Sequence, residues 1–153
     1  MAGNEEMIQS WPLPTTTSHD AEFWAAARRG ELSMQACAAC GRLSFPPRNM
    51  CPSCHSTQRQ WRALSGRGRI WSYTVPHPPL LPVFNDLAPY NVIVVELEED
   101  PAIRLVGNLI SSADDPINAV DPSSIQIGVP VKAVFVPMEE DATLIRWVRC
   151  VGG

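Results

Sequence analysis

The chain has 153 residues, of which 45% are hydrophobic and 18% charged, and its formal net charge is −4. This length suits one domain or two small ones, and no apolar run approaches the roughly 18 residues of a membrane-spanning helix, which excludes an integral membrane protein of the helical kind. The segment "MAGNEEMIQSWPLP" lacks the cationic and apolar regions of a signal peptide, so we expect a soluble, globular protein in the cytoplasm.

Charge is distributed unevenly along the chain. Residues 32–85 contain six arginines and no acidic residue, whereas residues 86–153 contain eleven acidic residues and four basic ones. The asymmetry indicates either a module that faces an anion or two modules that neutralise each other across an interface. Guanidinium groups suit bidentate contacts with phosphate or carboxylate but do not prove them, so both interpretations stay open.

The first element is an extended arm over residues 1–17. Pro12 and Pro14 interrupt it, and it shows neither helical nor strand periodicity. Its one aromatic residue, Trp11, is expected to anchor the arm on the body of the protein or on a partner. The body is slightly favoured, because a lone aromatic residue usually packs locally.

An N-terminal helix is expected over residues 18–31. Thr17 and Asp20 match the S/T-x-x-D/E signal of a helix start, and the run ends with two arginines and a glycine. Phe23 and Trp24 lie on an apolar stripe that a helix this short must dock on another surface. We therefore treat these two aromatic residues as candidate partner contacts, although the docking surface could belong to the same chain.

A zinc ribbon is expected over residues 32–64. Two C-x-x-C pairs are separated by ten residues, and they comprise Cys37, Cys40, Cys51 and Cys54. Each pair forms a tight turn with two sulfurs on one side, and two such turns complete a tetrahedron around zinc. Four protein ligands leave no coordination position for water, which predicts a structural Zn²⁺.

Other roles for the cysteines are less favoured. A thioredoxin-like redox site needs a C-x-x-C at the start of a helix, whereas the segment between these pairs contains Pro46 and Pro47. Iron held as in rubredoxin uses the same four sulfurs and is not excluded by the spacing. His55 follows the last of the four cysteines and is expected to have a structural role, and Cys150 is expected to be a small buried residue.

The remaining residues, 65–153, are expected to form a five-stranded OB-fold barrel. Several of the expected strands alternate apolar and polar residues, and the strands cover 68–75, 90–97, 102–109, 129–136 and 143–149. A single helical turn at 116–120 would lie between the third and fourth strands. Five short strands with such an insert describe an OB-type barrel, with a five-stranded sandwich as the competing architecture. The fold class is therefore mainly β.

The loop over residues 76–90, between the first two of these strands, contains five prolines. The prolines restrict the loop before binding, so little entropy is lost when Leu80, Leu81 and Phe84 are placed on another surface. Hydrophobic residues in a loop this long need cover, which favours contact with a partner or an acyl chain over folding back onto the barrel.

The chain resembles one known family, catalogued as domain of unknown function 35. The motifs that carry the resemblance occur in the family's order, and they are "EFWAAARRGEL", "CAACGRLSFPPRNMCPSC", "SGRGRIWSYTVPHPP", "APYNVIVVELEEDPAIRLVGNL" and "IGVPVKAVF". The resemblance covers roughly residues 18–149, and His55 departs from the glycine common in the second knuckle. It implies an N-terminal helix, a rubredoxin-like zinc ribbon and an OB-fold.

The resemblance also implies a function. Such proteins are accessory subunits of thiolase-fold enzymes, which include thiolases, acyltransferases and retro-aldolases, and the catalytic residues belong to the partner. The chain is thus expected to be a non-catalytic subunit that helps form an acyl-CoA site for carbon–carbon bond cleavage or formation, with a coenzyme A thioester as ligand of the complex. The residues agree, because the three histidines are scattered and no G-x-S-x-G motif or glycine-rich phosphate loop is present.

Arginines of the acid-free segment are candidate contacts for coenzyme A or another anion. They are Arg62, Arg67 and Arg69. The alternative is that they balance acidic residues such as Glu98 and Glu99.

Two further functions are compatible with parts of the sequence. Single-stranded nucleic acid could stack on Trp71 and Tyr73 of an OB-fold strand, but a pI near 5.3 opposes it. Electron transfer would require iron in place of zinc. We therefore expect no nucleic-acid partner and no membrane partner.

Overall fold

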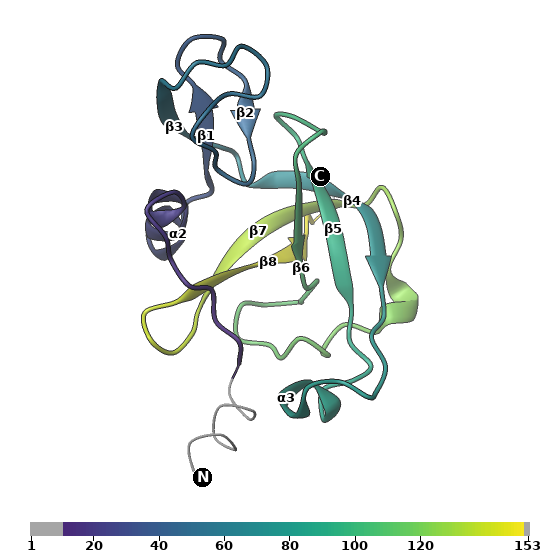
Figure 1. Ribbon diagram of the computed structural model, residues 1–153. Helices are drawn as coiled ribbons and strands as arrows, with labels where there is room; N and C mark the ends of the chain where they lie inside the picture. Colours follow the sequence, from purple (N-terminus) through teal and green to yellow (C-terminus); the bar gives the residue numbers. More distant parts are fainter. Residues whose placement is uncertain (1–10, 152–153) are drawn as a thin grey trace.

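A short helix, a three-stranded sheet and a curled five-stranded sheet follow one another along residues 11–151, the part of the chain that the computed structural model describes (Figure 1). The five-stranded sheet is a half-barrel of the OB type. The expected fold class is therefore confirmed. Among the described residues, no helix is long and apolar enough to cross a membrane. The first ten residues of the expected arm lie outside the described residues.

Helix α2 (Ala21–Arg28) is shorter than the expected helix, because residues 18–20 form a turn. The Asp20 carboxylate accepts hydrogen bonds from the backbone N–H and the hydroxyl of Thr17, at 2.6 and 2.9 Å, and from the indole of Trp24 at 3.3 Å. Desolvation raises the pKa of Asp20, but these bonds outweigh it and leave the pKa below its ordinary value. Gly30, with φ of 77°, ends the helix as expected.

The ribbon is an antiparallel sheet in the order β2-β1-β3, from β1 (Ser33–Cys37), β2 (Leu43–Ser44) and β3 (Arg59–Ala63). All five residues of β1 are buried. Leu32 and Met34 belong to the same hydrophobic core as Ile70 and Val95 of the half-barrel. The base of the ribbon therefore shares its core with the five-stranded sheet, whereas the cysteine turns lie at the far end (Figure 1).

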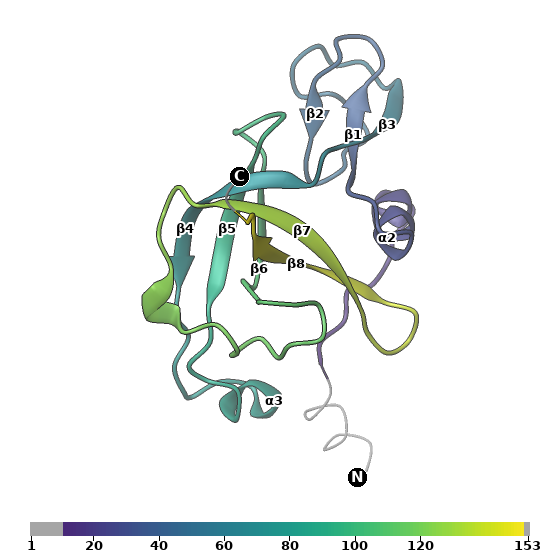
Figure 2. The same cartoon turned by 180° about the vertical axis from the view of Figure 1, so that it is seen from behind.

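The half-barrel is antiparallel, with the strand order β6-β5-β4-β7-β8. Its strands begin and end within two residues of the expected ones, and they are β4 (Arg67–Thr74), β5 (Val92–Leu97), β6 (Arg104–Gly107), β7 (Pro130–Pro137) and β8 (Thr143–Arg149). Figure 2 shows β7 and β8 from behind, with their hairpin beside α2.

The helical insert lies later in the chain than the sequence suggested. The 3-10 helix η1 (Pro122–Ser124) occupies this connection, whereas residues 116–120 form a turn. The side chain of Asp121 accepts a hydrogen bond from the N–H of Ser123 at 2.9 Å and so caps the short helix. A second short helix, α3 (Pro82–Asn85), lies in the proline-rich loop.

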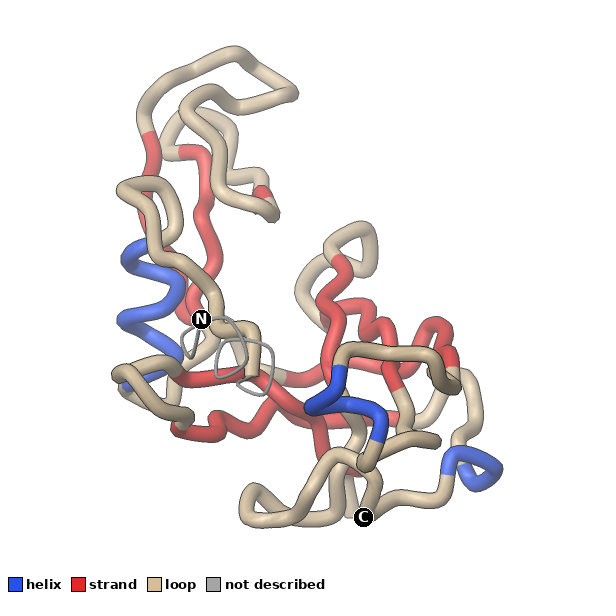
Figure 3. Tube along the Cα trace, turned by 60° about the horizontal axis from the view of Figure 1, so that its bottom comes forward, coloured by secondary structure: helices blue, strands red, loops and turns tan. Residues whose placement is uncertain are grey.

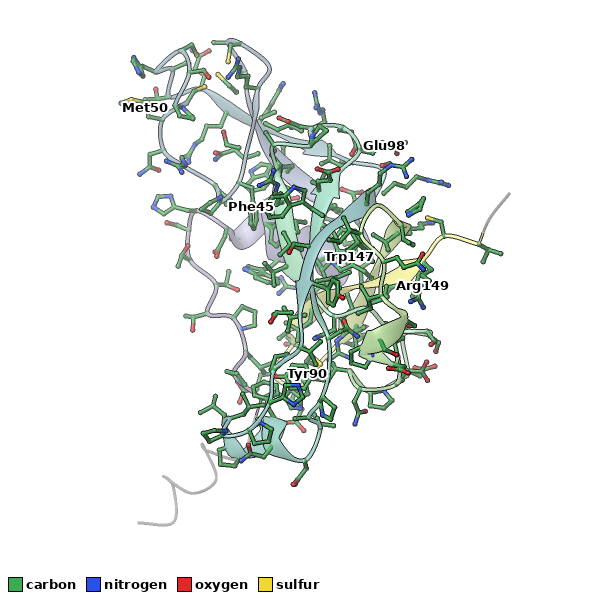
Figure 4. The ribbon with its side chains drawn as sticks, turned by 90° about the vertical axis from the view of Figure 1, so that its right-hand side faces the viewer. Phe45, Met50, Tyr90, Glu98, Trp147 and Arg149 are labelled. Atoms are coloured by element: carbon green, nitrogen blue, oxygen red, sulfur yellow. The ribbon has the colours of Figure 1, made fainter. Side chains whose placement is uncertain are left out.

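The half-barrel closes where the end of β6 meets β8. The N–H of Trp147 donates to Asn108 O at 3.0 Å, and the N–H of Ile110 donates to Trp147 O at 2.9 Å. Gly107 allows this approach, because a Cβ there would lie 3.0 Å from Nε1 of Trp147. Figure 4 shows Trp147 in the interior of the barrel.

Asn91, which is fully buried and directly precedes β5, supports this closure. Its Oδ1 accepts from the N–H of Leu109 at 2.6 Å, and its Nδ2 donates to Leu109 O at 2.9 Å. The side chain therefore satisfies both backbone groups of Leu109, as a paired strand would.

Replacing Asn91 with alanine is expected to lower the free energy of unfolding by about 3 kcal/mol, because the two backbone groups of Leu109 then stay buried without partners. The melting temperature, followed by circular dichroism, should fall by about 6–12 °C. Asn118→Ala is the matched control, because Asn118 is exposed. Equal melting temperatures for the two variants would contradict the role given to Asn91.

The described part of the arm packs on the body of this chain. The ring of Trp11 makes an edge contact with that of Phe84, with 4.9 Å between centroids, and the guanidinium of Arg146 lies 5.5 Å from the Trp11 ring. This is the anchoring that the sequence slightly favoured.

Candidate metal centre and ligand-binding surfaces

The four cysteine sulfurs of the ribbon lie together at its distal end. All four Sγ atoms are within 4.8 Å of one another. The Sγ atoms of Cys37 and Cys54 are 3.5 Å apart, and those of Cys40 and Cys51 are 3.6 Å apart. A tetrahedron with metal–sulfur bonds of about 2.3 Å has edges of about 3.8 Å. The residues present therefore fit a tetrahedral ion with four thiolate ligands.

The two cysteine turns have the same backbone geometry. The N–H of Gly41 donates to Cys37 O at 2.9 Å, and the N–H of His55 donates to Cys51 O at 3.0 Å. Gly41 and His55 occupy the same place in their turns, with φ of 76° and 62°. His55 thus fills the left-handed position that glycine fills in the first turn, and it is not part of the cluster of possible ligands among the described residues.

Backbone N–H groups in the two turns stabilise the ionised, thiolate form of some of these cysteines. The backbone N–H of Cys40 is the main cause that lowers the pKa of Cys37 to about 6, and the N–H of Cys54 lowers the pKa of Cys51. The N–H of Ser56 acts to lower the pKa of Cys54, but the nearby sulfur of Cys37 and desolvation raise it to about 11. Four crowded sulfurs therefore cannot all ionise without a cation among them.

Two of the three candidate anion-binding arginines lie together. Arg67 and Arg69 of β4 line a pocket of about 360 Å³ at one end of the half-barrel, together with Glu96 and Glu98. Arg69 is directly opposite Glu96 in the strand register and donates to Gly128 O at 3.1 Å. The pocket therefore offers both basic and acidic groups, and Figure 4 shows Glu98 beyond the end of its strand.

Arg62 does not line this pocket. It lies exposed on β3. Desolvation raises the pKa of Glu99, but the hydrogen bonds from Ser65 and, to a smaller extent, the charge of Arg62 lower it below its ordinary value. Cys150 does line the pocket and is half-buried rather than buried; it directly follows the end of β8 at Arg149, and its N–H still donates to Pro130 O of β7 at 3.0 Å.

The five candidate partner contacts differ in exposure. Phe23 is only 5% exposed and belongs to this chain's own core, because α2 docks on the ribbon and the half-barrel. Trp24, Leu80 and Phe84 are half-buried. Leu81, at 57% exposure, is the one broadly exposed member of the set.

Exposed aromatic residues also lie on β4, where Trp71 is 45% and Tyr73 is 40% exposed. The register shift between Ile70 and Ser72 leaves Trp71 as the extra residue of a bulge. The guanidinium of Arg104 lies 3.6 Å from the centroid of the Trp71 ring. One face of this indole is thus already covered by a cation.

One charged residue near these surfaces was not singled out from the sequence. Arg146 of β8 is only 6% exposed, and burial lowers the pKa of its guanidinium. The sequence does contain a pattern that indicates its burial, because the alternation of β8 places Arg146 on the same face as the apolar residues Leu144 and Val148.

Comparison with known proteins places both parts of the chain in one group. Residues 24–58 match the family model described as the rubredoxin-like zinc ribbon domain of ChsH2, and residues 61–136 match that of the C-terminal OB-fold domain of ChsH2. A DUF35 domain-containing scaffold protein of Methanothermobacter thermautotrophicus is 36% identical over 115 residues, which cover 74% of this chain and 78% of that protein.

A probable enoyl-CoA hydratase alpha subunit of Thermomonospora curvata is 36% identical over 133 residues, which are 87% of this chain. The match spans only 38% of that relative's length. Among solved structures, a chain of the Ltp2-ChsH2(DUF35) aldolase superposes with a TM-score of 0.77 at 34% identity, covering 90% of this chain and 99% of that one.

Proposed function

Because the chain belongs to the DUF35 family of zinc-ribbon and OB-fold proteins, we propose that it is a non-catalytic subunit that assembles with a thiolase-fold enzyme. The subunit would help to form the acyl-CoA site of that enzyme, which breaks or makes a carbon–carbon bond. The likeness to the Ltp2-ChsH2(DUF35) aldolase, over 99% of the matched chain, carries the proposal.

The placement of the histidines supports assigning catalysis to the partner. His19, His55 and His77 are all exposed and come from the turn before α2, the ribbon and the loop before α3. A nucleophile–base pair requires side chains within hydrogen-bond reach of one another. Among the described residues, the hydrogen bonds of side chains include no Ser–His or Cys–His pair.

For the metal centre, we propose zinc bound by Cys37, Cys40, Cys51 and Cys54. The geometry of the four sulfurs supports a closed tetrahedral site, which has no position for water or substrate. The ion would then hold the two turns of the ribbon together and take no part in the reaction.

For the pocket, we propose that Arg67 and Arg69 contact the phosphates of coenzyme A. Substituting both with alanine is expected to raise the KM of the assembled enzyme for its acyl-CoA about tenfold and to leave kcat unchanged, because the lost contacts are equally present in the ground and transition states. Arg42→Ala is the control, because Arg42 bonds to Ser53 in the ribbon. An unchanged KM in the double variant would indicate instead that these arginines balance the charge of the neighbouring acidic residues and do not contact coenzyme A.

Native mass spectrometry of the tagged chain, purified gently from its own host, tests the proposed function. We expect one zinc per copy and a co-purifying thiolase-fold subunit. Turnover of acyl-CoA by the purified chain alone would contradict the non-catalytic role. A chain that repeatedly arrives with zinc but without any thiolase-fold protein would contradict the partner.

A further inference from the structure

Arg146 is a buried cation for which the described residues provide no polar partner. Its side chain lies on β8 and is 6% exposed, and no described residue forms a hydrogen bond with its enclosed Nε. Among the described residues, ion pairs are formed by Arg29 with Glu22 and Glu31, and none by Arg146. Buried charges in native proteins are paired or bound to an anion with few exceptions, so the absence of a partner is itself informative.

The surroundings of Arg146 give little compensation for its burial. The ring of Trp11 lies 5.5 Å from the guanidinium, within the range of a cation–π contact, but an aromatic ring carries no negative charge that would neutralise the guanidinium. Burial also lowers the pKa of Arg146, which reflects the cost of keeping its charge in this place. An anion at the guanidinium would remove this cost, and a carboxylate matches the planar fork of nitrogens with two parallel hydrogen bonds.

The ring of Trp11, beside the guanidinium, begins a group of apolar side chains, which we call the apolar frame. Trp11 contacts Phe84, whose ring centroid lies 5.9 Å from that of Tyr90. Leu81, 57% exposed, directly precedes the same short helix α3. Figure 3 turns this end of the barrel, with α3, toward the viewer. An arginine among aromatic residues with an exposed leucine at the margin has the composition of an interface centre.

We propose that Arg146, together with Trp11, Phe84 and Leu81, receives one acidic side chain of the thiolase-fold partner. The inference rests on the proposed function and adds to it the place and the chemistry of one contact. A protein carboxylate is favoured over a free phosphate, because it carries the single negative charge that one guanidinium neutralises and because the apolar frame suits protein side chains. Binding of the partner then pairs a charge that has no ion-pair partner among residues 11–151.

The first test measures the stability of the free, zinc-loaded full chain. Arg146→Leu keeps an apolar side chain at this position, although a shorter one, and removes the buried charge, so the melting temperature is expected to rise by about 2–4 °C. Arg149→Leu is the matched control on the same strand, because Arg149 donates to the backbone and the hydroxyl oxygens of Ser124, both at 3.0 Å. That variant loses bonds and should not gain stability.

The second test measures binding of the thiolase-fold subunit that co-purifies with the wild-type chain, by calorimetric titration. Arg146→Leu is expected to weaken the Kd by about 30-fold or more, because the partner's carboxylate would be buried without its cation. Arg146→Lys keeps the positive charge but not the planar pair of guanidinium nitrogens. Its Kd should therefore lie between those of the wild-type chain and Arg146→Leu. We expect Arg146→Leu to raise the melting temperature of the free chain and also to raise the Kd of the complex. If Arg146 only stabilised its own chain, its replacement would not have these two effects together.

Three outcomes overturn the proposal, and they are distinguishable. If the wild-type chain binds a thiolase-fold subunit and Arg146→Leu binds it equally well, the proposed function stands and the role of Arg146 is wrong. If Arg146→Leu and the double variant Glu5→Gln/Glu6→Gln both lower the melting temperature of the free chain, Arg146 pairs within its own chain. If the wild-type chain binds no thiolase-fold subunit, the proposed function fails and this contact with it.

Discussion

Removing the metal is expected to unfold the ribbon and to destabilise the half-barrel. The ribbon has two strands of five residues and one of two, too little structure to persist without its ion. Structural zinc contributes about 10–16 kcal/mol to the folding of such small units. Because Leu32 and Met34 share a core with Ile70, loss of the ribbon also uncovers part of the half-barrel. A zinc chelator in excess should therefore abolish the cooperative melting transition seen by circular dichroism.

Cysteine variants separate loss of the metal from other effects of chelation. Cys51→Ser removes one of the four sulfurs and should release the metal, which elemental analysis of the purified protein measures. Cys150→Ser is the matched control, because Cys150 is half-buried and lies outside the cluster. Retention of one zinc and of the wild-type melting temperature by Cys51→Ser would refute the four-cysteine site.

The gathering of the four cysteine sulfurs was predictable from the sequence, because its geometry is local. Each C-x-x-C turn is closed by bonds between neighbouring residues, and Gly41 and His55 supply the left-handed positions. The five strands were also predictable, since their alternation follows directly from one buried face. The strand order, by contrast, was not predicted, because alternation within a strand does not tell which strands pair.

Features that depend on tertiary contact were missed. The bond between Asn91 and Leu109 joins residues 18 positions apart, and nothing local marks Asn91 as a partner of that backbone. Phe23 was considered as a partner contact because an amphipathic helix does not tell which surface it meets, and here it meets the core of its own chain. Arg146 was read as one member of an alternating strand, and its burial depends on residues that pack over it.

Substitution of Trp147 by alanine should be the most damaging single change within the half-barrel. Trp147 has no exposed surface, and both of its backbone groups make the hydrogen bonds that close the barrel. Its indole lies against Gly107, which has no side chain to move into the space. A large cavity therefore remains in Trp147→Ala, and we expect a loss of about 3–5 kcal/mol in the free energy of unfolding.

Trp147→Phe distinguishes packing from the chemistry of the indole. Nε1 of Trp147 is buried and forms no hydrogen bond with residues 11–151, so phenylalanine removes an unsatisfied donor while it keeps most of the apolar volume. We therefore expect this variant to lose less than half of the free energy that Trp147→Ala loses, in urea denaturation followed by circular dichroism. If phenylalanine and alanine are equally destabilising, the indole N–H must have a partner in solution, such as a bound water, and the closure depends on that bond rather than on packing.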